Sequence, residues 1–178
     1  MLRLRDICIM SINNILSKTE FAQIGWVVPD IRASVEFLSK TLGIQGFPEP
    51  QHRNAHDANV KYHGKIVHAE WYVSQTYHGG TFIELIQPLS GQSIFQDYLT
   101  KYPAGGVQHM AFRLPVSGLS SLVDAIRSEG YEQIGECVHP IAHMIFFDTY
   151  KTLGVATEIM GITPEGWEAI EKMKTGGS

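Results

Sequence analysis

The sequence has few cysteines, no cluster of basic residues and no long apolar run, and each shortage excludes a class of protein. Its two cysteines, Cys8 and Cys137, form no CxxC motif, so a disulfide scaffold is excluded and reduced thiols are expected. Lys and Arg number 14 against 18 for Asp and Glu, a formal charge of −4, and we expect no nucleic-acid partner. No apolar run reaches the ~20 residues that a membrane-spanning helix needs, so we expect no membrane partner.

What remains is the composition of an ordinary globular domain, with 44% hydrophobic and 10% aromatic residues among 178. At ~150 residues per domain, this length suits one domain or a compact duplicated one. Residues 1–20 are interpreted as an N-terminal extension, and Met10 is an alternative start within it. The extension lacks the uninterrupted apolar core and cleavage site of a signal peptide, so a cytoplasmic location is expected.

Two stretches of the chain repeat the same order of features, which indicates an internal duplication. Gln23 and His109 each lie six residues before a proline, and each proline is followed by a helical pattern that ends at a glycine. Glu84 and Glu158 each lie four residues after a glycine. We therefore divide the chain into a first module, a second module, and a C-terminal helix and tail, spanning residues 21–103, 104–161 and 162–178.

Hydrophobic periodicity predicts the same βαβββ order in both modules, with a long insertion in the first. The elements expected in the first module are strands over 21–28, 65–74 and 81–87, helices over 31–42 and 93–102, and a long loop over 45–60. Those expected in the second are strands over 107–114, 131–138, 144–148 and 155–160 and a helix over 119–129.

Four polar residues interrupt the apolar strand patterns at positions that the duplication pairs: Gln23 with His109, and Glu84 with Glu158. A single His or Glu on a strand is more often a hydrogen-bonded residue than a ligand. Four at paired positions favour a metal site, because a two-fold arrangement of the modules would bring them to one point. Two carboxylates, an amide oxygen and an imidazole suit a divalent ion such as Zn, Ni, Co, Mn or Mg, with positions left open for water or substrate.

Other polar residues carry weaker signals. Arg113 follows His109 at even spacing and so points to the same face, where it could bind an anionic group or form a salt bridge. His143 lies between apolar residues at the start of a strand and is a further candidate for a functional histidine. The six remaining histidines are expected in loops, turns or exposed faces.

The segments that carry these residues resemble the vicinal oxygen chelate superfamily, which includes glyoxalase I, methylmalonyl-CoA epimerases, extradiol dioxygenases and bleomycin- and fosfomycin-resistance proteins. The resemblance spans about residues 21–161. Its motifs are IGWVVPDIRASVEFLSKTLGI, GTFIELIQPLSGQSIFQDYL, GGVQHMAF and FFDTYKTLGVATEI. Within the superfamily, the chain is most similar to the methylmalonyl-CoA epimerases.

The resemblance implies an α+β fold, in which two duplicated βαβββ modules form a cupped mixed sheet around one metal with the helices outside. It also implies Gln23, Glu84, His109 and Glu158 as the ligands. The epimerases usually have His at the position of Gln23, whereas Gln is found there in some glyoxalase I enzymes. Glu49 is a loose match to the second glutamate base of the epimerases, and HPIAHMIFF stands in place of their glycine-rich turn.

The function expected from these residues is that of a metal-dependent isomerase, epimerase or lyase that removes a proton next to a carbonyl. The metal stabilises the resulting enolate. Glu158, with Glu84 or Glu49 opposite, would take and return the proton. The expected partner is a small substrate with two neighbouring oxygens, an acyl-CoA being one candidate, and a homodimer is the default assembly.

Two alternatives stay open at this point. Ring-cleaving oxygenation is disfavoured, because His109 would be the only histidine ligand. A protein that binds an aromatic drug without a metal could line its pocket with Phe21, Phe82 and Trp26, but it has no need of four coordinating side chains.

Overall fold

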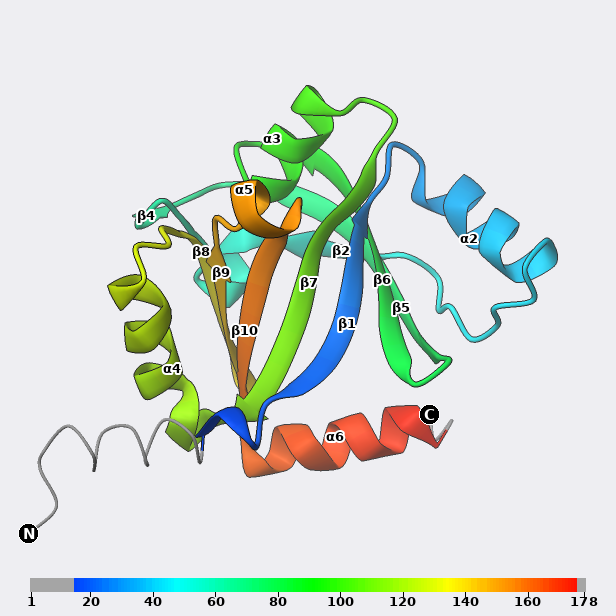
Figure 1. Cartoon of the computed structure of the whole chain (residues 1–178). Coiled ribbons are helices and arrows are strands. Elements are labelled where there is room, and N and C mark those ends of the chain that lie inside the picture. The colour runs from blue at the N-terminus through cyan, green and yellow to red at the C-terminus, as the bar shows by residue number, and fades with distance from the viewer. Residues whose placement is uncertain (1–14, 176–178) are drawn as a thin grey trace, which may run out of the picture.

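The structure, a computed structural model, describes residues 15–175, so most of the N-terminal extension lies outside the described residues. Its ten strands form one mixed sheet that curls into a half-barrel with helices outside it (Figure 1). The strand order is β2-β5-β6-β1-β7-β10-β9-β8-β3-β4. This arrangement confirms the predicted α+β class.

Each half of the sheet repeats one pattern. The first half contains β1 (Glu20–Val27), β2 (Gln51–Asn54), β5 (Glu70–His78) and β6 (Thr81–Ser90). The second contains β7 (Gly106–Pro115), β8 (Gln133–His139), β9 (Ala142–Phe147) and β10 (Ala156–Ile162). β1 pairs with β6, and β7 with β10, in parallel, while β1 and β7 pair antiparallel and join the halves. The duplicated βαβββ order inferred from the sequence is therefore present.

The insertion of the first half crosses to the second half. It contains the 3-10 helix η1 (Ala55–Ala58) and the hairpin of β3 (Lys61–Tyr62) and β4 (Lys65–Ile66), and β3 pairs with β8. The expectation of a loop over 45–60 is wrong in part, because β2 and η1 lie within it. β2 is an edge strand that pairs only with β5, and its polar sequence QHRN has no alternation to reveal it.

The helices α2 (Ile31–Lys40) and α4 (Val116–Ser128) cover the outer face of the sheet. Asp30 caps α2, and its Oδ1 accepts a hydrogen bond from the backbone N–H of Ala33 at 3.0 Å. Apolar residues of α2 pack against β6, and those of α4 against β7, β9 and β10. The buried side chains in these contacts are Ile31, Leu38, Ile83 and Leu85 for α2, and Leu119, Leu122, Val123, Leu114, Ile145, Phe147 and Ile159 for α4.

Two further helices lie at opposite ends of the half-barrel, α3 (Ile94–Lys101) at the top of Figure 1 and α6 (Pro164–Lys174) at the bottom. The short α5 (Tyr150–Leu153), which the sequence analysis did not predict, precedes β10. Ile170 of α6 is buried against Phe82 and Ile162. α3 and α6 therefore flank the half-barrel at its two ends.

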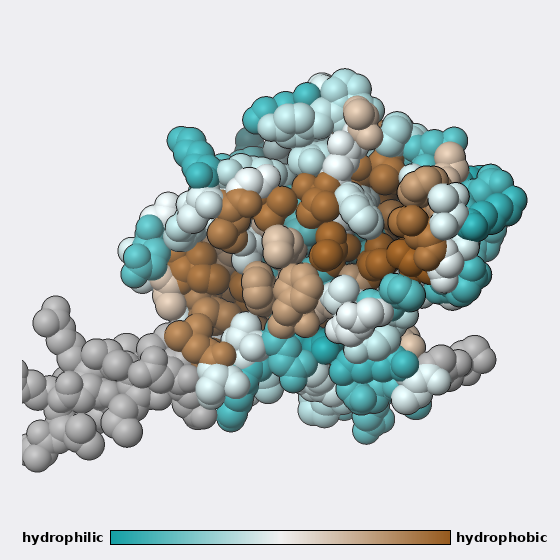
Figure 2. All heavy atoms as spheres, turned by 45° about the vertical axis from the view of Figure 1, so that its right-hand side comes forward, coloured by the Kyte–Doolittle hydropathy of each residue, from teal (hydrophilic) through white to brown (hydrophobic). Residues whose placement is uncertain are grey.

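The outer surface is uneven in polarity. Figure 2 shows apolar side chains gathered over the middle of one face, above the polar surface of α6. No helix between residues 15 and 175 is long and apolar enough to cross a bilayer.

Candidate metal centre

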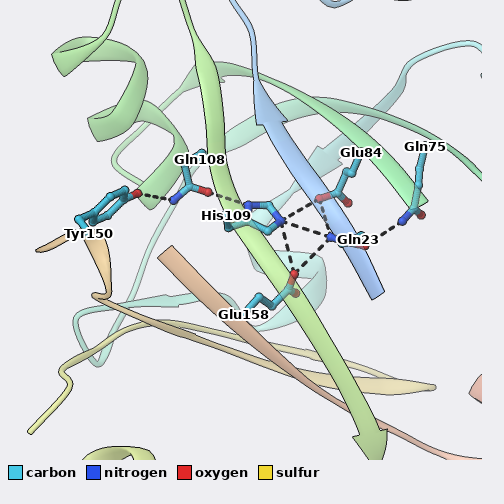
Figure 3. Close-up of polar contacts among 7 residues, drawn as sticks. All are labelled: Gln23, Gln75, Glu84, Gln108, His109, Tyr150 and Glu158. Atoms are coloured by element: carbon cyan, nitrogen blue, oxygen red, sulfur yellow. Dashed lines mark hydrogen bonds and ion pairs between the residues drawn. The ribbon is translucent and has the colours of Figure 1, made fainter. Parts of the chain in front are cut away.

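Four neighbouring strands at the middle of the sheet each contribute one polar residue to a cluster on the inner face (Figure 3). In sheet order these are Glu84 on β6, Gln23 on β1, His109 on β7 and Glu158 on β10. Ile83 and Leu85 pack under α2 on the outer face, so the alternation of a strand turns Glu84 inward. Gln23, His109 and Glu158 are buried, and Glu84 is 20% exposed.

The four side chains meet at their polar ends. The Nε2 atom of Gln23 lies 3.1 Å from Oε2 of Glu84, 3.2 Å from Oε2 of Glu158 and 3.3 Å from Nε2 of His109. The same imidazole nitrogen lies 3.4 Å from each carboxylate oxygen. The two halves of the chain therefore supply two residues each to one cluster.

Gly25 makes room for the imidazole. It is the register partner of Glu84 on one side and of His109 on the other. A Cβ atom at residue 25 would lie 1.9 Å from Cε1 of His109, closer than any real contact. A glycine inside a strand often marks such a close approach, and this signal was available in the sequence.

The electrostatics of the cluster follow from burial and opposite charge. Burial alone would lower the pKa of His109, but the hydrogen bond to Glu84 and the charges of Glu158 and Glu84 outweigh it and raise the pKa. Burial raises the pKa of Glu158 to about 7, against the opposing effect of His109 and with help from the charge of Glu84. Both shifts follow from the close approach of one imidazole and two carboxylates in a buried site.

A second layer of residues holds the cluster, and the sequence analysis missed it. The Nε2 group of Gln75 donates to Oε1 of Gln23 at 2.9 Å. On the other side, Oε1 of Gln108 lies 2.7 Å from Nδ1 of His109, and its Nε2 group donates to the hydroxyl of Tyr150 at 2.7 Å. A glutamine in a strand is typical of an exposed face, so nothing in the pattern distinguished Gln75 or Gln108.

The spacing of the donor atoms suits one divalent ion. Five of the six edges of the tetrahedron formed by these four atoms measure between 3.1 and 3.4 Å. A regular tetrahedron with edges of about 3.3 Å has its centre about 2.0 Å from each corner, the usual length of a bond from zinc to nitrogen or oxygen. Among residues 15–175, no group of three or more His, Cys, Asp and Glu side chains is arranged to hold a metal ion, and Gln23 is the fourth possible ligand that this cluster offers. Rotation of its amide would turn Oε1 toward the ion.

Two cavities meet the cluster. The α3 cavity, of about 130 Å³, has Glu84 and Glu158 in its wall and is otherwise largely aromatic and aliphatic. Its aromatic lining includes Trp71, Phe95 and Phe146. The α6 cavity, of about 140 Å³, reaches the cluster at Gln23 and is lined by apolar residues of β9, β10 and α6. A substrate could therefore approach the carboxylates through the α3 cavity.

Glu49 does not join the other predicted site residues. It lies on the surface, 72% exposed, and pairs with Arg32 at the start of α2. The expectation that Glu49 faces the metal came from a loose loop match, and the structure gives this carboxylate no part in the cluster.

The weaker signals have structural explanations. Arg113 is buried, its Nη2 atom lies 3.1 Å from Oε2 of Glu20, and its guanidinium stacks over Trp167 at 5.4 Å. His143 lies 2.9 Å from Oε1 of Glu136. The salt-bridge alternative for Arg113 is thus the one observed.

The three aromatic residues considered for a drug pocket do not share one. Phe82 lines the α6 cavity, whereas Trp26 lines a groove beside α2. Phe21 is 40% exposed and contacts Phe112 edge to face.

Comparison with known proteins places the chain in a family. Residues 22–147 match the family described as the Glyoxalase/Bleomycin resistance protein/Dioxygenase superfamily. The chain belongs to this superfamily. The resemblance seen in the sequence is thereby confirmed, since vicinal oxygen chelate is another name for the same fold family.

Several solved structures share this architecture at low sequence identity. A hypothetical protein from Bacillus halodurans is 17% identical with a TM-score of 0.58, over 80% of this chain and 94% of its own. Methylmalonyl-CoA epimerase from Mycobacterium tuberculosis is 19% identical with a TM-score of 0.54, over 82% and 89%. A methylmalonyl-CoA epimerase from Streptomyces coelicolor, in complex with 2-nitronate-propionyl-CoA, is 20% identical with a TM-score of 0.52, over 80% and 96%. No curated protein matches the sequence.

Proposed function

We propose that this chain is a metal-dependent isomerase, epimerase or lyase that exchanges a proton on the carbon next to a carbonyl. The observation that carries the proposal is the convergence of four side chains, in which the carboxylate oxygens of Glu84 and Glu158 lie 3.1 to 3.4 Å from Nε2 of Gln23 and Nε2 of His109. The donor set favours Zn, Ni, Co, Mn or Mg. A cation bound by these side chains would polarise the substrate carbonyl and stabilise the negative charge that develops on its oxygen.

The carboxylates of the cluster are the groups that exchange the proton. Both Glu84 and Glu158 line the α3 cavity, so both are within reach of a molecule bound there. A carboxylate in contact with the bound substrate can accept the proton and return it. Return to the opposite face of the same carbon gives an epimer, and return to the neighbouring carbon gives an isomer.

The proposed substrate is a small molecule with two neighbouring oxygens, and an acyl-CoA thioester is one candidate. One of the solved structures similar to this chain is a methylmalonyl-CoA epimerase in complex with methylmalonyl-CoA and NH₄⁺. Its sequence identity is 20%, so the similarity supports the fold, and the choice of substrate depends on the experiment below. A homodimer stays a prediction.

Solvent deuterium uptake tests the assignment. The zinc-loaded protein is incubated in D₂O with methylmalonyl-CoA and with a panel of α-hydroxy-carbonyl and dicarbonyl compounds, and uptake is read by mass spectrometry. We expect Glu158→Gln to abolish uptake by the active compound, and Glu49→Gln, the control at the surface, to leave it unchanged. Unchanged uptake by Glu158→Gln would contradict the role of this residue.

One observation favours a second candidate, a small-molecule-binding protein that uses no metal. Among the described residues, every buried side-chain nitrogen and oxygen already has a hydrogen-bond partner. The Gln23 amide group donates a hydrogen bond to both carboxylates and so stabilises them without a cation. Metal content separates the candidates, because only the enzyme requires an ion.

A further inference from the structure

A line of hydrogen bonds leaves the cluster on the far side of the His109 ring (Figure 3). Gln108, the next residue on β7, is completely buried, and its Oε1 atom lies 2.7 Å from Nδ1 of His109. Its Nε2 group donates to the hydroxyl of Tyr150 at the first turn of α5, also at 2.7 Å. The ring is therefore held at both nitrogens, by the cluster at Nε2 and by Gln108 at Nδ1.

The chemistry of the amide decides where the ring proton lies. A carbonyl oxygen only accepts hydrogen bonds, so Nδ1 of His109 must carry a proton to bond to Oε1 of Gln108. With that proton on Nδ1, the neutral ring has its lone pair on Nε2, the atom that faces Glu84, Glu158 and Gln23. This tautomer is the one that a cation in the cluster needs.

Tyr150 anchors the far end of the Gln108 amide. If the Gln108 amide were rotated by half a turn, its NH₂ group would donate to Nδ1, and the ring proton would move to Nε2 and block a cation. In the observed orientation Nε2 of Gln108 donates to the Tyr150 hydroxyl at 2.7 Å, which fixes the position of the amide between Tyr150 and His109. Tyr150 is itself fixed, because it packs against the cluster of Ile134, Phe146 and Ala156 and stacks on Tyr98 with ring centroids 6.4 Å apart.

We propose that Gln108, anchored by Tyr150, is a positioning residue that keeps the proton of His109 on Nδ1 and so leaves Nε2 free to bind a cation. The inference rests on the proposed function, because it assigns to the cluster the role of binding a metal. It adds to the four proposed ligands two residues, Gln108 and Tyr150, that position one of them, His109. Such outer partners of a metal-binding histidine typically change metal affinity by about 10- to 100-fold when they are removed.

Four variants test the proposal. Gln108→Leu removes the acceptor at similar size, Gln108→Glu keeps an oxygen acceptor, and Tyr150→Phe removes only the anchor. Gln96→Leu is the control, since the side chain of Gln96 bonds to Thr100 on the exposed side of α3. Zn²⁺ affinity is measured by competition with a chromophoric chelator, and the protonation of each ring nitrogen of His109 by ¹⁵N NMR of histidine-labelled protein.

We expect the full chain to show the proton on Nδ1 with and without Zn²⁺. Gln108→Leu should lose about 10- to 100-fold in Zn²⁺ affinity, whereas Gln108→Glu and the control should stay close to the parent protein. Tyr150→Phe should lose less than Gln108→Leu and show a second His109 species with the proton on Nε2. If Gln108→Leu does not fold, the Zn²⁺ affinity and His109 protonation of Tyr150→Phe and Gln108→Glu are compared with those of the parent protein.

Three results would overturn the proposal: a His109 ring protonated only on Nε2 in the parent protein, parent Zn²⁺ affinity in a folded Gln108→Leu, or a Tyr150→Phe protein identical to the parent in both measurements. Failure of the proposed function looks different. In that case the parent protein binds no Zn²⁺, while the NMR spectra of the metal-free parent and variants still show whether Gln108 holds the Nδ1 proton.

Discussion

At the residue scale, the place of the His109 ring depends on the lack of a side chain at residue 25. The ring fills the space that a Cβ atom there would occupy, with Cε1 only 1.9 Å from its position. Both residues are in the middle of paired strands, so neither backbone can move far without breaking the β1–β7 ladder.

Gly25→Ala should therefore displace the imidazole from the cluster. We expect a loss of about 1 to 3 kcal/mol in the free energy of unfolding, the usual cost of overpacking, together with loss of metal binding. Denaturant unfolding and Zn²⁺ titration measure the two effects. Gly130→Ala is the control, because Gly130 has a positive φ of 87° and open space around it. It should lose stability through backbone strain and keep its metal affinity, and a Gly25→Ala protein that binds metal normally would contradict this account.

Glu136 is the residue whose titration should affect stability at acidic pH. Burial alone would raise its pKa, but hydrogen bonds from Lys61 and His143, at 3.0 and 2.9 Å, and their charges lower it below the ordinary 4.5. A carboxyl with a lowered pKa in the folded state stabilises the protein above its ordinary pKa, and this contribution disappears as the pH falls through the lowered pKa.

Glu136→Gln should accordingly reduce the free energy of unfolding by about 1 kcal/mol at pH 7, the scale of a partly exposed ion pair. The difference from the parent protein should shrink as the pH falls from 4.5 through the lowered pKa, below which the carboxyl is protonated in both states. Urea unfolding at several pH values between 7 and 3 measures it. A difference that is the same at all pH values would show that the carboxyl acts through packing instead.

At the element scale, α3 brings an aromatic ring to the centre. Ser93 caps this helix, and its Oγ accepts a hydrogen bond from the backbone N–H of Gln96 at 3.1 Å. The side chain of Gln96 does not return the bond to the backbone of Ser93 and bonds to Thr100 instead. The ring of Phe95, in the first turn, lies 6.3 Å from that of His109.

Ser93→Ala should lower the free energy of unfolding by about 1 kcal/mol through loss of the cap. Asp30→Ala, which removes the cap of α2 on the outer face, should cost a similar amount. The two variants should differ at the centre, because only α3 touches it. We expect weaker Zn²⁺ binding in Ser93→Ala than in Asp30→Ala, and equal binding would mean that α3 does not shape the cluster.

At the scale of the whole molecule, the duplication explains both what could be predicted from the sequence and what could not. Gln23 and Glu84 could be paired with His109 and Glu158 because a buried polar residue in an apolar strand is costly and the repeat put two such residues in each half. A two-fold arrangement of the modules predicts that the four side chains meet. The sheet order β6-β1-β7-β10 places their strands side by side.

The parts that break the repeat were missed. β2 has a polar sequence and β3 and β4 are very short, and the pairing of β3 with β8 depends on a contact between distant parts of the chain. Gln75, Gln108 and Tyr150 gain their roles from partners on other strands or in α5, which no local pattern reports. Glu49 was considered for the site because of a loose loop match. In the structure it lies at the surface and pairs with Arg32.

The most direct test of the central claim is the metal content of the reconstituted, desalted protein by elemental analysis, beside His109→Ala, Glu158→Ala and the control His52→Ala. His52 is an exposed residue that pairs with Glu70 on the edge of the sheet, so its loss should leave the cluster intact. The account predicts about one divalent ion per chain in the parent and the control and none in the two cluster variants. A parent protein that remains metal-free, or cluster variants that retain the ion, would contradict it.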